Sequence, residues 1–102
     1  MSFDVQLLPR DQTFLEGCAD IPDARRDAIL WSALQGLENV TDEARADPAS
    51  RLPNDLFVYQ MAFRGKESYC SLRFFVSDRH AVNGVLVVVF VDTVTGPRRW
   101  AG

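Results

Sequence analysis

The chain has few of the residues that build metal, redox or cofactor sites. Its 102 residues include two cysteines and one histidine, and no Cys-x-x-Cys pair occurs. This supply fits no structural zinc site, so we expect neither a metal nor a cofactor. Cys18 falls in a helical pattern and Cys70 in a strand pattern, which predicts two buried thiols rather than a disulfide.

Long apolar runs are also missing. The longest, Val85–Val91, is far too short to cross a bilayer, and the opening Met1–Arg10 is too short and too polar for a signal peptide. The sequence therefore predicts a cytoplasmic protein without membrane contact. A length of 102 residues predicts a single domain over residues 1–102, with enough chain for a two-layer core.

Lysine is scarce, since Lys66 is the single lysine and the other ten basic residues are arginines. Charge is divided along the chain. Residues 1–55 carry eleven acids and five bases (net −6), whereas residues 56–102 carry three acids and six bases (net +3). A basic half is typical of a surface that binds an anion, nucleic acid being the obvious one. The whole chain is nonetheless acidic, with a pI near 5.0.

The first half predicts one strand and two helices. Phe3–Leu7 alternates apolar and polar residues, as in a half-buried strand. Asp11 is expected to cap a short helix, and a second helix is expected from Asp23 to Leu37. The expected inward stripe of the second helix is Ala24, Ala28, Trp31 and Leu34, widened by Ile29, Leu30 and Leu37. Residues 38–55 are polar, with a helical turn at Thr41 as one option, and are predicted to be the most mobile internal segment or to be ordered only by a partner.

The second half predicts three successive strands, Leu56–Phe63, Tyr69–Val76 and Val85–Val91. Short connections make them an antiparallel meander. Val85–Val91 lacks polar alternation, so we expect it to be a central strand buried on both faces. The helices must pack their apolar stripes on this sheet. The predicted fold class is therefore α+β, with two layers in the order β-α-α-β-β-β and an antiparallel meander sheet covered on one face by two helices.

Three passages carry a family resemblance together with this order: Phe3–Pro9, Asp55–Phe63 and Leu72–Asp78. They resemble the RelE/ParE family of bacterial toxins, and the likeness extends over nearly the whole chain. Members belong to toxin–antitoxin pairs; one branch cleaves messenger RNA on the ribosome and another inhibits DNA gyrase. The resemblance implies a RelE/ParE-like domain with an antitoxin protein as partner.

RNA cleavage by an internal 2′-hydroxyl needs a base, positive groups for the phosphate and a proton donor, but no metal. The candidate catalytic residues are Arg73, Tyr69, Arg64 and Lys66. By strand alternation, Tyr69 and Arg73 are expected to share the sheet face that the helices leave open. Candidate nucleic-acid contacts are Arg79, His80, Arg98 and Arg99. Simpler interpretations stay open. Arg64 and Lys66 also fit a solvated hairpin tip, Arg73 also fits an exposed-face residue or a salt-bridge partner, and His80 fits a loop without a role.

Two functions are consistent with these residues. The first is a toxin that acts on ribosome-bound mRNA as a metal-independent endoribonuclease; the basic sheet half favours it. The second is a non-catalytic binding module of the same fold that inhibits a macromolecular partner such as gyrase. The acidic pI favours the second function, as does the residue after Tyr69: it is Cys70, where family nucleases usually have an arginine.

Overall fold

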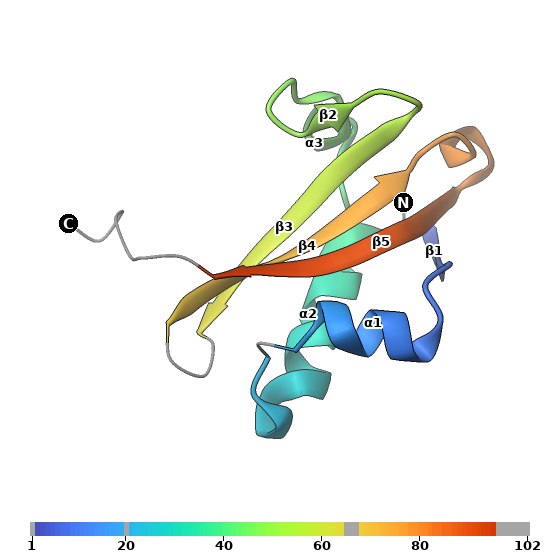
Figure 1. The fold of residues 1–102 in the computed structure, drawn as a ribbon. Coiled ribbons are helices and arrows are strands. Elements are labelled where there is room, and N and C mark those ends of the chain that lie inside the picture. The colour runs from blue at the N-terminus through green and yellow to red at the C-terminus, as the bar shows by residue number, and fades with distance from the viewer. Residues whose placement is uncertain (1, 20, 65–67, 96–102) are drawn as a thin grey trace.

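The computed structural model describes residues 2–19, 21–64 and 68–95. These residues form one mixed sheet of five strands in the order β1-β5-β4-β3-β2 (Figure 1). Its strands are β1 (Asp4–Leu7), β2 (Arg51–Leu52), β3 (Leu56–Arg64), β4 (Tyr69–Ser77) and β5 (Val85–Thr95). The predicted meander is confirmed, since β3, β4 and β5 pair antiparallel in succession. The sheet is not wholly antiparallel, however, because β1 pairs parallel with β5.

The helices are α1 (Asp11–Gly17), α2 (Arg26–Glu38) and the short α3 (Asp42–Ala46), with 3-10 turns at Asp23–Arg25 and Ala81–Asn83. Helices α1 and α2 lie on the same side of the sheet (Figure 1). The predicted α+β class is confirmed; helix α3 begins after Thr41, where a helical turn was one option, whereas the two-residue strand β2 was not predicted.

The core lies between these helices and one sheet face. Alternate residues of each long strand are buried there, as the pattern predicted for β3 and β4. The buried set is Cys18, Ile21, Ile29, Ala33, Leu37, Phe57, Phe63, Cys70, Leu72, Phe74, Val76, Leu86, Val88 and Val91. Both cysteines are buried free thiols, as expected, and burial raises the pKa of Cys18 to about 11.

Strand β5 is central, as predicted, with β1 and β4 as its neighbours. Burial on both faces was wrong, since the helices cover one face only and Phe90 is 47% exposed. A β-bulge in this strand changes which of its side chains face the core. Phe75 pairs with Phe90 while Val76 pairs with Val88, so Val89 is an extra residue. Beyond the bulge, Val91 faces the core and Phe90 faces away from it.

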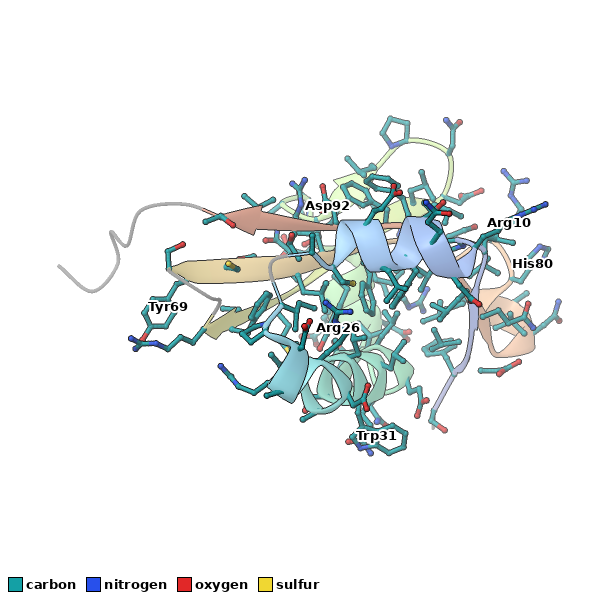
Figure 2. All side chains as sticks on the ribbon, turned by 60° about the horizontal axis from the view of Figure 1, so that its bottom comes forward. Arg10, Arg26, Trp31, Tyr69, His80 and Asp92 are labelled. Atoms are coloured by element: carbon teal, nitrogen blue, oxygen red, sulfur yellow. The ribbon has the colours of Figure 1, made fainter. Side chains whose placement is uncertain are left out.

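Helix α2 is rotated relative to the expected stripe. Its buried residues are Ile29, Ala33 and Leu37, whereas Trp31 is 63% exposed and points away from the sheet (Figure 2). The reason is the close approach of helix and sheet, because a Cβ on Gly36 would lie 1.9 Å from the hydroxyl of Tyr59. Small residues fit that contact and an indole does not.

Residues 38–55, which are polar in composition, contain the short helix α3 and the strand β2. The Thr41 side chain accepts a hydrogen bond from the Ala44 N–H and so caps α3. Arg45 and Arg51 both bind the Asp78 carboxylate, and the Val58 N–H donates to the carbonyl of Ser50 at 2.9 Å. Ion pairs thus hold a segment that has little apolar surface of its own.

Candidate partner-binding face

The sheet face opposite the helices carries the side chains that alternate with the core residues. We call it the open face. Strand pairing arranges it in rows across β3, β4 and β5. The rows are Val58–Phe75–Phe90, Gln60–Arg73–Asp92 and Ala62–Ser71–Val94. Arg73 therefore lies where the alternation predicted, at the centre of this face.

Arg73 is held by a bidentate ion pair. Its Nε donates to Asp92 Oδ1 at 2.8 Å and its Nη2 donates to Asp92 Oδ2 at 2.6 Å. The guanidinium also lies over the Phe75 ring, 5.3 Å from the centroid. The hydrogen bonds to Asp92 raise the pKa of Arg73, so it stays charged and paired. A phosphate at this position would have to compete with a carboxylate that already occupies the fork.

Aromatic side chains lie beside this ion pair. The Phe75 and Phe90 rings have centroids 5.5 Å apart and planes inclined at 56°. Phe90 and Val94 are both among the exposed large apolar residues. The centre of the open face therefore combines a solvent-accessible aromatic ring with a neutralised ion pair.

Two other candidates meet at one end of the open face. Arg64 pairs with Tyr69 across β3 and β4, and its guanidinium lies 5.6 Å from the Tyr69 ring centroid. The Arg73 row lies four residue pairs further along the strands, beyond Ala62–Ser71. Four residues of strand span about 13 Å. Arg64 and Tyr69 thus form one pair and Arg73 with Asp92 another. Lys66 lies outside the described residues.

Two of the candidate nucleic-acid contacts, Arg79 and His80, lie away from that end. Figure 2 shows Tyr69 and His80 at opposite ends of the molecule, with Asp92 between them. Arg79 and His80 follow the far end of β4 and are exposed, and Arg79 Nε lies 3.5 Å from Asp55 Oδ2. Arg98 and Arg99 fall outside the part of the chain that the structure describes. Arg79 and His80 are therefore too remote to assist a reaction at Arg64 and Tyr69.

The sequence did not predict the cluster that Asp78 forms with Arg45 and Arg51. Asp78 has a side chain only 10% exposed; it accepts 2.7 and 2.8 Å hydrogen bonds from Arg51 and a 3.0 Å bond from Arg45. These bonds, with Arg51 making the largest contribution, lower the pKa of Asp78. The partners lie 27 and 33 residues away along the chain, so no local pattern indicates the cluster. It joins α3, β2 and the end of β4, which is a structural role.

No group of three or more His, Cys, Asp or Glu side chains within residues 2–19, 21–64 and 68–95 is placed to hold a metal ion. In the same ranges, no helix is long and apolar enough to cross a membrane.

Comparisons with family models, curated proteins and solved structures return no match to the chain. The RelE/ParE resemblance therefore remains an inference from the residues and their order.

Proposed function

We propose that this protein is a non-catalytic binding module of RelE/ParE-like architecture that inhibits a macromolecular partner by covering part of its surface. The observation that carries the proposal is the engagement of Arg73 by Asp92 beside the exposed ring of Phe90. The proposed contact surface is the open face.

The charge arrangement supports a protein partner over RNA. Arg73, at the centre of the open face, and Arg79 both contact carboxylates, so each guanidinium already has a counter-charge within the fold. Nucleic-acid binding draws its affinity from cations that are free to replace counterions. Aromatic and arginine side chains at the centre of a face, with polar neighbours such as Gln60 and Ser71, are typical of protein interfaces.

The family resemblance supplies the biological setting. A toxin of the gyrase-directed kind acts by binding, and an antitoxin protein keeps it inactive. We propose the same division here, with the open face as the surface that meets the inhibited protein.

The test compares two exposed aromatic residues on opposite sides of the molecule. We expect expression of the wild-type chain to arrest bacterial growth, Phe90→Ala to relieve the arrest, and Trp31→Ala to leave it unchanged. Far-UV circular dichroism should show that both variants keep the fold, because both side chains are exposed. Gyrase supercoiling and ribosomal translation, each assayed with purified protein, identify the inhibited system. Arrest that is equally strong in wild type and Phe90→Ala refutes the open face as the binding surface.

An endoribonuclease on the ribosome is the second candidate, and the Arg64–Tyr69 contact favours it. A guanidinium stacked on a phenol ring places a charge and a proton donor together at one end of the open face. This candidate requires that programmed ribosomes incubated with the protein yield cleaved mRNA, and that Arg64→Ala abolish the cleavage while Arg79→Ala does not. Cleavage with that dependence would replace the binding-module proposal.

A further inference from the structure

Strand β1 forms one edge of the sheet, and half of its backbone groups point away from the sheet. The Asp4 N–H donates to the Gly84 carbonyl and the Leu8 N–H to the Val88 carbonyl, both at 2.8 Å. By alternation, Asp4, Gln6 and Leu8 bond to β5, while Val5 and Leu7 present their N–H and C=O groups outward. Within the described residues, no other backbone group pairs with these outward groups.

An apolar groove adjoins this edge on the helix side. It has a volume of about 390 Å³ and is lined by Leu7, Pro9, Asp11, Phe14 and Leu15. Two of the lining leucines are accessible to solvent: Leu7 is 43% exposed and Leu15 is 47% exposed. A group of exposed aliphatic side chains around a groove marks an interaction site on a soluble chain.

The wall of the groove is fixed in place. A Cβ on Gly17 would lie 2.1 Å from the carbonyl oxygen of Val91, so helix α1 approaches the backbone of β5 as closely as glycine allows. Phe14, on the same helix, packs against the core cluster. The groove is therefore largely formed before any partner binds.

The edge and the groove fit one kind of ligand. Leu7 bears both an outward backbone and a side chain that lines the groove. A strand added beside β1 would bond to Val5 and Leu7 and place every second side chain on the helix side, beside Leu7. The hydrogen bonds and the apolar contacts would thus come from the same extended segment.

The charges near this edge favour a basic partner segment over a second copy of the chain. Strand β1 and helix α1 carry three acids, Asp4, Asp11 and Glu16, all exposed, and the segment that joins them carries one base, Arg10. A second copy of the chain would bring like charges together at this edge, where opposed like charges are destabilising. A segment with aliphatic side chains on the helix side would place its basic side chains on the opposite sheet face, where Asp4 lies by alternation with Val5 and Leu7.

We propose that the free edge of β1 and its groove bind an extended, basic segment of a partner protein, with aliphatic side chains at alternate positions. The proposal is independent of the open face, which lies on the opposite side of the sheet. The other edge of the sheet suits this role less well. There, β2 and Ser50 cover the start of β3, and Arg25 Nη1 donates to the Arg64 carbonyl at 2.9 Å.

The test uses a labelled eight-residue peptide of alternating valine and lysine, with fluorescence anisotropy as the readout. We expect saturable binding, weakened about tenfold or more when N-methyl groups block the backbone hydrogen bonds. Replacing lysine by glutamate in the peptide should weaken binding similarly. Leu15→Glu in the protein should also abolish it, whereas Trp31→Ala, an exposed control on helix α2, should not.

Amide chemical shifts locate the peptide. The proposal expects the largest changes at Val5 and Leu7; changes centred on Phe90 would overturn it. Equal binding of the valine–glutamate or N-methylated peptide would also overturn it. So would a dimer in analytical ultracentrifugation that Leu15→Glu dissociates, since the occupant would then be a second copy.

Discussion

The two faces of the sheet use aromatic side chains in opposite ways. On the helix side, Phe57 and Phe74 are inaccessible and belong to a wholly apolar core. On the open face, Phe75 and Phe90 form an aromatic pair beside the Arg73–Asp92 ion pair, and Phe90 is exposed. An apolar residue under a covering layer stabilises the fold, whereas an exposed one with polar neighbours is available to a partner. The same strands therefore contribute to stability through one face and present the other face to a partner.

The largest expected effect comes from deleting one ring on each face. Phe74→Ala should lower the free energy of unfolding by about 3–5 kcal/mol, because it leaves a cavity in a fully buried site. Phe90→Ala should lower it by about 1 kcal/mol, through loss of the pair with Phe75. Urea titration followed by circular dichroism measures both values.

A domain of this size has about 5–15 kcal/mol of stability, so Phe74→Ala can leave too little folded protein to measure. Phe74→Leu then serves as the milder variant, with a loss of about 1.5 kcal/mol. Equal losses at Phe74 and Phe90 would mean that the open face is covered in solution, and the comparison of the two faces would fail.

A smaller effect is expected where Asp78 binds Arg51 and Arg45. Asp78→Asn should lower the free energy of unfolding at pH 7 by about 1–3 kcal/mol, because it removes charge-assisted hydrogen bonds from a nearly buried carboxylate. The folded state lowers the pKa of Asp78, so this contribution is present above the unfolded pKa of about 3.9 and is lost as the pH falls through the folded pKa.

The pH dependence separates this cluster from general acid denaturation. Urea titrations at pH 7, 5 and 3 should show a smaller loss of stability on acidification in Asp78→Asn than in wild type. If both proteins lose the same amount between pH 5 and pH 3, the ion pairs of Asp78 do not hold residues 38–55 in the way inferred above.

Local patterns predicted the strands well, because alternation decides which residues of β3 and β4 reach the core. They failed where contacts between distant parts of the chain determine the local structure. The orientation of Trp31 depends on how closely Gly36 approaches Tyr59, and the order of residues 38–55 depends on Asp78. Neither contact leaves a local signal.

Local patterns were also insufficient to predict the contacts of the candidate site. The sequence placed Arg73 and Tyr69 on the open face, but it did not indicate that Asp92 would pair with Arg73. Strict alternation from Leu86 and Val88 would direct Asp92 into the core. The bulge at Val89 reverses that alternation and brings Asp92 beside Arg73. A one-residue irregularity, invisible in composition, thus neutralises the arginine at the centre of the face.

The smallest expected effect on stability concerns that ion pair. Its side chains are 33% exposed for Arg73 and 26% exposed for Asp92. A double-mutant cycle with Arg73→Met and Asp92→Asn should give a coupling energy of about 0.2–1 kcal/mol, the range for accessible pairs. Urea titration of the four proteins measures it. A coupling well above this range would mean that the pair mainly stabilises the sheet.

The same variants decide whether Asp92 keeps Arg73 from phosphate. Asp92→Asn leaves the guanidinium without a carboxylate on the accessible side of the sheet. We expect this variant to bind a short single-stranded RNA more tightly than wild type, with a log–log salt slope steeper by about 0.7, one additional phosphate contact. Adding Arg73→Met should return both values to those of wild type. Wild-type protein that already binds RNA as tightly as Asp92→Asn would show that Asp92 exerts no such control, and the argument for a protein partner would lose its main support.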